Sequence, residues 1–247
     1  RQGPVHINIP RDILSNKSKF LKFTSHKKKE LNEINIRDVN KILDLIKRSN
    51  KPVIIAGGGV KNSENYKEVM IFAEYFQIPV VSSAGHGDAI PYNKKLYAGQ
   101  MGPRGNPIAT KLIREADLIF ALGTRLGFNS TFYSYDNINK LAKIIQIDAD
   151  IKSIGRYFPI KMGVCCDVKD LMVKLNSLLK KQNLASINKS WTKDFLIKKN
   201  EYYKKRDKDA DIKTIPIQPS GLYKELRSLL PKNSAVTLDA GTLCLQA

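Results

Sequence analysis

The sequence predicts an α/β fold, an open parallel sheet with helices on both faces. Short apolar runs rich in Ile, Val and Leu alternate with amphipathic segments, and continuous apolar runs are typical of parallel strands buried on both faces. Residues 52–56 run into three glycines, 57–59, and residues 143–147 run into the acids Asp148 and Asp150. Glycines after a strand let backbone amides approach a phosphate, and carboxylates at a strand end accept hydrogen bonds from a ribose. We therefore expect a crevice for a nucleotide at these strand ends.

The first part of the chain is expected to hold one strand and one helix before the main sheet. Residues 5–9 alternate between apolar and polar and stop at Pro10, which favours a short strand. Residues 11–35 lack periodicity and predict a linker. Asp38 is expected to cap a helix that ends near Ser49.

The main sheet is expected to contain five strands. Each is a short apolar run, and in chain order they are residues 53–56, 79–82, 118–122, 143–148 and 161–165. The helices that cover them are expected at residues 63–76, 107–116 and 167–179. Residues 83–106 are expected to form a long loop containing several glycines, and such loops are often functional.

The last part of the chain is expected to begin another domain. Residues 183–216 predict a charged, partly helical connector. Residues 219–230 predict a helix with leucines along one face, and residues 235–238 predict the start of a strand before a turn.

Composition limits the compartment and the class of protein. A hydrophobic content of 42% in 247 residues is enough for a packed core, and no apolar run is long enough to span a membrane. Three cysteines, Cys165, Cys166 and Cys244, favour a reducing compartment, so we expect a cytoplasmic protein. The chain starts at Arg1 without Met and stops at Ala247 inside an apolar stretch. We expect an internal piece of a longer protein, truncated at both ends.

The net charge of +19 does not by itself indicate a nucleic-acid partner. Residues 51–166, which carry the motifs, hold 14 basic and 9 acidic side chains, and the positive charge is densest before and after them. The sequence lacks the common nucleic-acid-binding motifs. We therefore expect no nucleic-acid partner and no membrane. A basic nucleic-acid-binding protein is kept as an alternative interpretation of the charge.

Several short motifs together resemble the thiamine diphosphate (ThDP) enzymes of the acetolactate synthase type. The motifs that are similar to the central domain of that family are residues 52–59, 99–102, 122–125, 145–150 and 166–168. Residues 3–10 resemble the exit from the family's first domain, and residues 236–241 resemble the opening of its third. The order and spacing of the motifs over nearly the whole chain carry the resemblance, because each motif alone is weak.

The resemblance implies how the chain is divided into domains. It implies the end of a pyrimidine-binding domain and a linker over residues 1–35, a Rossmann-like central domain over 36–182, a linker over 183–216 and the start of a diphosphate-binding domain over 217–247. The glutamate that activates the cofactor and the Mg²⁺-binding segment would lie outside these residues. No catalytic residue and no metal ligand is therefore assigned here, and the 247-residue chain alone is expected to be inactive.

The resemblance also implies an activity. The full-length protein would use ThDP and Mg²⁺ as a homodimer or homotetramer, and would act on a small 2-oxo acid or related carbonyl compound by decarboxylation or acyl-anion transfer. Acetolactate synthesis, sulfoacetaldehyde acetyl transfer and simple 2-oxo acid decarboxylation all fit. The alternative from another class is a non-catalytic module that binds FAD or ADP.

Cofactor contacts are implied for sixteen residues at the motifs. They are Gly57, Gly58, Gly59, Gly99, Gln100, Met101, Gly102, Gly123, Thr124, Arg125, Asp148, Asp150, Asp167, Val168, Asp239 and Gly241. Most would face FAD or ADP in the central domain, whereas the last two would face the ThDP diphosphate. The chain departs from FAD-binding relatives after Arg125, where residues 126–129 read Leu-Gly-Phe-Asn in place of more polar residues.

Each of these groups also has a structural alternative. The glycines can form a tight turn, the aspartates can cap helices, Met101 can fill a gap in the core and Arg125 can be a surface charge. Arg104 lies in the same long loop, and His86 is expected to form a hydrogen bond within its loop rather than act as a base.

Overall fold

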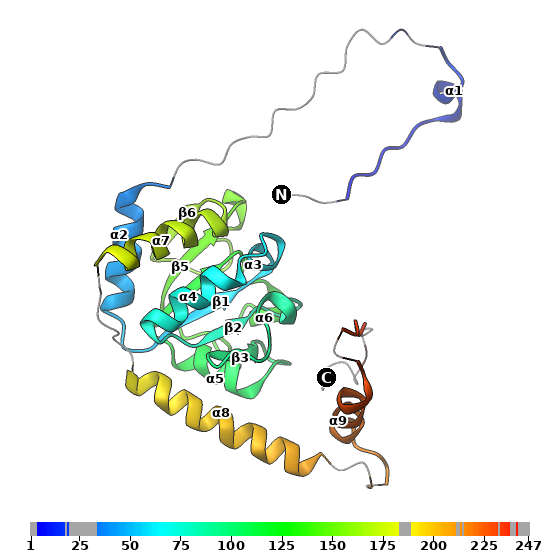
Figure 1. The fold of residues 1–247 in the computed structure, drawn as a ribbon. Helices are drawn as coiled ribbons and strands as arrows, with labels where there is room; N and C mark the ends of the chain where they lie inside the picture. Colours follow the sequence, from blue (N-terminus) through cyan, green and yellow to red (C-terminus); the bar gives the residue numbers. More distant parts are fainter. Residues whose placement is uncertain are drawn as a thin grey trace.

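The computed structural model describes residues 4–17, 19, 34–182, 189–210, 213, 215–231, 233–237 and 241. Its centre is a six-stranded, all-parallel sheet in the order β3-β2-β1-β4-β5-β6 (Figure 1). The strands are β1 (Pro52–Ala56), β2 (Val80–Ser82), β3 (Tyr97–Gln100), β4 (Leu118–Leu122), β5 (Lys143–Asp148) and β6 (Met162–Cys165). The predicted open parallel α/β sheet is confirmed.

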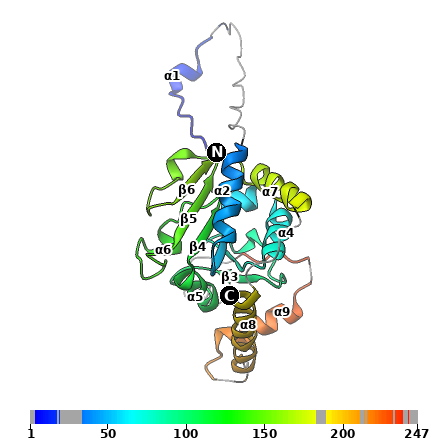
Figure 2. The same ribbon diagram turned by 90° about the vertical axis from the view of Figure 1, so that its left-hand side faces the viewer.

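Helices cover both faces of the sheet (Figure 2). One face carries α2 (Ile36–Lys47), α4 (Tyr66–Phe76) and α7 (Val168–Gln182), and the other carries α5 (Pro107–Glu115) and α8 (Lys189–Asp209). Alternation along β4 shows how one strand serves both layers. Phe120 packs in the cluster under α2, α4 and α7, whereas its neighbours Ile119 and Ala121 pack in the cluster under α5 and α8.

Shorter elements lie in the loops or outside the sheet. They are α1 (Arg11–Leu14), α3 (Gly58–Asn62), η1 (Gly87–Ala89), α6 (Phe128–Thr131), η2 (Ile151–Ser153) and α9 (Pro219–Leu229). None of the described helices is both long and apolar enough to cross a membrane.

The prediction for the N-terminal residues was wrong in three places. Residues 5–9 are irregular and exposed, because no strand of the described chain lies beside them to complete a ladder. The short helix α1 lies within the predicted linker. The helix α2 begins at Ile36 and is capped by Asn35, whose side chain accepts a hydrogen bond of 2.9 Å from the amide of Arg37, rather than by Asp38.

The helix predicted over residues 63–76 begins later, at Tyr66, and a separate short helix, α3, precedes it. The helix α3 starts directly at Gly58, and Ser63 is its C-cap rather than the N-cap of the second helix. The hydroxyl of Ser63 donates to the carbonyl of Gly59 at 2.5 Å. Glu64 then has a φ of +52°, which ends the helical path before α4 begins at Tyr66.

One loop prediction and one strand prediction were also wrong. The loop predicted over residues 83–106 contains η1 and the edge strand β3, which is paired to β2 with an irregular register. Residues 235–237 are not in a strand, and Leu238 lies outside the described residues.

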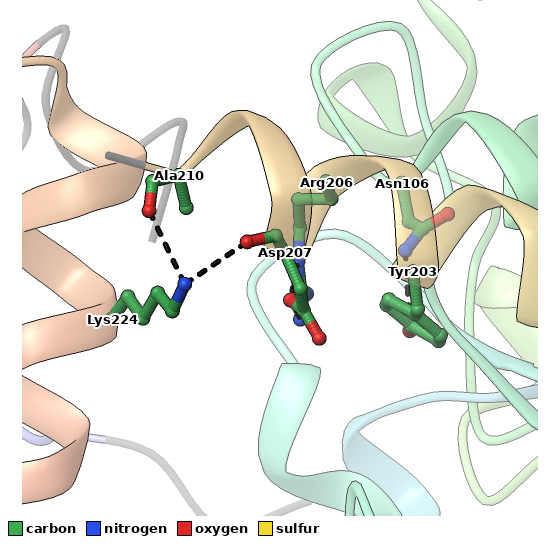
Figure 3. Close-up of polar contacts among 6 residues, drawn as sticks. All are labelled: Asn106, Tyr203, Arg206, Asp207, Ala210 and Lys224. Carbon is green, nitrogen blue, oxygen red and sulfur yellow. Dashed lines mark hydrogen bonds and ion pairs between the residues drawn. The ribbon is translucent and has the colours of Figure 1, made fainter.

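The predicted connector is dominated by α8, which joins the sheet to α9. The indole of Trp191 donates to the carbonyl of Pro52 at 3.1 Å, and this bond fixes the start of α8 under β1. At the other end, the ammonium of Lys224 on α9 donates to the carbonyls of Asp207 and Ala210, at 3.0 and 3.3 Å (Figure 3). Lys224 thus holds α9 at the carboxyl end of α8. The predicted domain boundaries stay predictions.

Candidate functional site

The predicted site residues of the central sheet lie along one edge, where the parallel strands end. Residues 57–59 follow β1, residues 123–125 follow β4, Asp148 ends β5 and Asp167 follows β6. The strands β1 and β4 are neighbours, yet the chain proceeds from them to opposite sides of the sheet. This switch in strand order is where ligands bind in open α/β sheets, and the order of all six strands is the one common in dinucleotide-binding sheets.

The glycines after β1 pack directly against the turn after β4. The amides of Gly57 and Gly59 donate to the carbonyls of Leu122 and Gly123, at 2.9 and 3.0 Å. A Cβ atom on Gly57 would lie 2.4 Å from the Gly123 oxygen, and one on Gly59 would lie 2.6 Å from the Gly123 Cα. The close approach of the backbone after β1 to the backbone after β4 is therefore enough to require glycine at positions 57 and 59. A contact of these glycines with a ligand stays a prediction.

The middle glycine, Gly58, lies against His86. A Cβ atom at this position would be 2.9 Å from the imidazole Cε1. Burial is the largest cause that holds the pKa of His86 below its ordinary value, and the positive charge of Lys61 adds to it. Lys61, in the last turn of α3, also pairs with Asp88 at 2.6 Å. The imidazole is thus favoured in its neutral form.

Each predicted aspartate of the central sheet accepts a backbone hydrogen bond that shapes its own loop. Asp148 accepts from the amide of Asp150 at 2.9 Å, and Asp150 accepts from the amide of Lys152 at 3.0 Å and caps η2. Asp167 accepts from the amide of Lys169 at 2.7 Å, at the start of α7. The capping alternative is therefore realised for Asp150 and Asp167, whereas Asp148 closes a turn at the end of β5. Ribose contacts stay predictions for all three.

The segment from β3 to α5 is tied to neighbouring loops. Gln100 accepts from the amide of Gly85 at 3.1 Å, and Met101 is 1% exposed in the cluster under α5. Gly99 and Gly102 have φ of +98° and +118°, which glycine adopts without strain. Met101 thus packs in the core, as its structural alternative states.

Arg125 is an exposed cation at this edge. It forms no ion pair with any described residue, and its strand-end position suits an anion. Its neighbour Thr124 is buried and accepts from the amide of Leu126 at 3.3 Å. Val168 is buried and would be 3.3 Å from a Cβ atom on Gly59. A Cβ atom added to Gly241 would meet no described residue within 4 Å, whereas Asp239 lies outside the described residues.

Gln146 also shapes the edge, although the sequence did not single it out. Its amide nitrogen donates to the carbonyls of Thr124 and Ser153, both at 3.0 Å, and its oxygen accepts from Gly155 at 2.8 Å. It is 2% exposed and so connects three backbone groups inside the protein. A polar residue in the middle of an apolar run is the signal that could have predicted this role.

An exposed group of aromatic residues follows Arg125 and was also not predicted. Phe128, Phe132 and Tyr133 lie on and after α6 and are 53%, 37% and 49% exposed. Their density within six residues of the chain is the available sequence signal. Large aromatic surfaces are normally buried, and an exposed apolar group of this kind is typical of a binding surface.

A surface hollow lies away from this edge, between α5 and α8. Its lining includes Leu112, Trp191 and Phe195 together with the ends of lysine and acidic side chains. It is a packing seam between two helices without convergent polar groups, so the strand edge is the stronger candidate site.

Comparisons with known proteins agree with the motifs. The family described as "Thiamine pyrophosphate enzyme, central domain" matches residues 39–175. The chain is 35% identical over 185 residues to a sulfoacetaldehyde acetyltransferase of Castellaniella defragrans, which covers 74% of the chain and 31% of that protein. It is 30% identical over 255 residues to the acetolactate synthase large subunit of Buchnera aphidicola subsp. Acyrthosiphon pisum (strain APS), which covers 98% of the chain and 42% of that protein. The chain thus spans less than half the length of these relatives.

Proposed function

Because the chain belongs to the thiamine pyrophosphate enzyme family and contains its central domain, we propose that the full-length protein is a ThDP-dependent enzyme. It acts on a 2-oxo acid or a related carbonyl compound, by decarboxylation or by transfer of an acyl-anion equivalent to an acceptor. The observation that carries the proposal is the family match over residues 39–175, which covers all six strands of the parallel sheet and most of the helices on it. Two relatives, an acetolactate synthase large subunit and a sulfoacetaldehyde acetyltransferase, support it.

ThDP and Mg²⁺ are the proposed cofactors of the full-length protein. When bound, ThDP supplies stabilisation of negative charge on the former carbonyl carbon, and the protein supplies orientation and electrostatics. Asp239 and Gly241 are the residues of this chain proposed to lie on its diphosphate side. The central domain would act as the scaffold that connects the two domains between which the cofactor lies.

The edge formed by the ends of β1 and β4 is the proposed site for FAD or ADP. Exposed Arg125 matches the charge and the bidentate geometry of a diphosphate, and the edge lies at the switch point of the sheet. Each of the three carboxylates has acceptor sites beyond the one that its backbone hydrogen bond uses. With these sites, Asp148, Asp150 and Asp167 would accept hydrogen bonds from the sugar.

Assembly and location are further parts of the proposal. We propose a homodimer or homotetramer in the cytoplasm, with small-molecule substrates and without a nucleic-acid partner. The cysteines suit a reducing compartment, since the described pair are free thiols and burial raises the pKa of Cys166 to about 12.

Substrate consumption by the full-length protein tests the function. Purified protein with ThDP and Mg²⁺ is assayed against pyruvate, a panel of other 2-oxo acids and sulfoacetaldehyde. Consumption of at least one compound is expected. A well-folded protein that consumes none of them would contradict the proposed function.

A further inference from the structure

We propose that Phe128, Phe132, Tyr133 and Tyr157 form an aromatic platform that stacks against the planar base of a nucleoside diphosphate at the sheet edge. This inference rests on the proposed nucleotide site and adds to it the part of the ligand that these rings recognise. The platform is made by α6, the turn after it and the loop between β5 and β6.

The four rings form one continuous row. The centroids of Phe132 and Phe128 are 4.8 Å apart and stacked, Phe128 and Tyr133 are 5.6 Å apart, and Tyr133 and Tyr157 are 4.5 Å apart. An arginine lies at each end. The guanidinium of Arg104 is 5.9 Å from the ring of Phe132, and that of Arg156 is 5.2 Å from the ring of Tyr157. The row therefore offers π surface flanked by positive charge.

The backbone that carries three of the four rings adopts φ values that are unfavourable for bulky residues. Leu126, Phe132 and Tyr133 all have positive φ, at +53°, +48° and +54°. Bulky residues in this region are strained, and such strain is concentrated at ligand clamps and active sites. The side-chain oxygen of Thr131 donates to the carbonyls of Leu126 and Gly127, at 3.2 and 3.1 Å.

Two further hydrogen bonds complete this arrangement. The amide of Tyr133 donates to the hydroxyl of Thr131 at 3.1 Å, and the side chain of Asn137 donates to the carbonyl of Thr131 at 3.1 Å. Both Thr131 and Asn137 are buried. Phe128, Phe132 and Tyr133 are thus presented to solvent by a segment that is fixed from beneath, while Tyr157 adjoins them half-buried from the neighbouring loop.

The row is continuous with the proposed diphosphate contact. Arg125 immediately precedes the strained turn, and a Cβ atom on Gly127 would lie 3.7 Å from its Nε. Gly102 packs against the carbonyl of Asn129, at 2.9 Å for an added Cβ, so the β3–α5 loop adjoins α6. Arginine charge suits phosphates, whereas exposed rings suit a planar base. A ligand with both parts fits this surface better than a sugar phosphate without a base.

Binding of ADP to the full-length protein, measured by calorimetry, tests the platform. Phe128→Leu keeps an apolar side chain but removes the ring, and loss of base stacking should weaken ADP binding about tenfold. The matched control is Tyr135→Leu, because Tyr135 is 45% exposed and outside the row. Inorganic diphosphate, which has no base, should bind the wild type and Phe128→Leu equally.

The outcomes separate this inference from the nucleotide site itself. If ADP binds the wild type and Phe128→Leu alike, the platform is overturned and the nucleotide site stands. If neither ADP nor FAD binds the wild type, both are overturned. Thermal unfolding checks that Phe128→Leu is folded; should it not be, Tyr133→Leu takes its place, with the same tenfold loss expected and an unchanged affinity contradicting the platform.

Discussion

The amide of Gly59 donates a 3.0 Å hydrogen bond to the carbonyl of Gly123, and this contact joins the ends of β1 and β4 at the switch point of the sheet. The two Cα atoms are so close that a Cβ atom on Gly123 would lie 2.4 Å from the Cα of Gly59. Backbone contact of this kind fixes the separation of the two turns that carry the candidate site. It also shows why glycines occur at both positions.

Gly123→Ala is expected to destabilise the fold. The φ of Gly123 is +60°, which alone costs a residue with a Cβ atom about 1–3 kcal/mol, and the clash with Gly59 adds to this cost. Urea unfolding measures the loss. Gly85→Ala is the control, because Gly85 has a φ of +82° but nothing within 4 Å of an added Cβ. Equal losses for the two variants would contradict the close contact.

Gln146→Met is expected to lower the free energy of unfolding by about 2–4 kcal/mol, because it removes bonds to buried backbone groups while keeping the length of the side chain. Chemical denaturation of the variant gives the value. Lys143→Met, at the exposed start of the same strand, should change stability by less than about 0.5 kcal/mol. A Gln146→Met variant as stable as the wild type would show that the three hydrogen bonds do not contribute.

The pKa of His86 should be below its ordinary value, mainly through burial and next through Lys61. A histidine with a lowered folded-state pKa binds fewer protons than in the unfolded chain, so its contribution to stability is lost as the pH falls below about 6.5. Lys61→Met removes a positive charge and frees Asp88, and both changes should raise the pKa.

Titration of the His86 ring signals by NMR measures this pKa in the wild type and in Lys61→Met. Lys67→Met, on the exposed side of α4, is the control and should leave it unchanged. A pKa of His86 above about 6.5 in the wild type would contradict the described surroundings of the ring.

Lys224→Met should release α9 from the end of α8, because it removes both hydrogen bonds to the carbonyls of Asp207 and Ala210. Faster hydrogen exchange of the amides of α9 is expected, with α2 and α4 unchanged. Lys208→Met, an exposed lysine near the same end of α8, is the control. If exchange in α9 is the same in Lys224→Met and Lys208→Met, the hydrogen bonds of Lys224 do not hold the helix.

Strands that are continuous apolar runs could be predicted from the sequence alone. The bounds predicted for the strands at residues 118–122 and 143–148 match β4 and β5. By contrast, β3 has four residues, two of them Gly and Gln, so its strand conformation depends on pairing with β2 rather than on local pattern. The alternation of residues 5–9 was misleading for the same reason, since a strand forms only beside a partner.

The location of the candidate site was predictable, whereas part of its composition was not. A parallel sheet brings the residues after each strand to one edge, so the motifs around Gly57, Gly123 and Asp148 had to converge there. The aromatic row depends on a contact between Tyr133 and Tyr157, which are far apart in the sequence. Its positive φ values are likewise set by buried hydrogen bonds rather than by the local sequence.

ThDP dependence of catalysis tests the proposed function most directly. The full-length protein is freed of ThDP and Mg²⁺, and consumption of pyruvate, other 2-oxo acids and sulfoacetaldehyde is followed before and after both are restored. The 247-residue chain is assayed in parallel and is expected to be inactive, because it lacks the neighbouring domains that would position the cofactor. Loss of such positioning can raise the activation free energy by about 7–11 kcal/mol. We predict that turnover by the full-length protein appears only with ThDP and Mg²⁺. Equal turnover without them, or turnover by the 247-residue chain alone, would contradict the account.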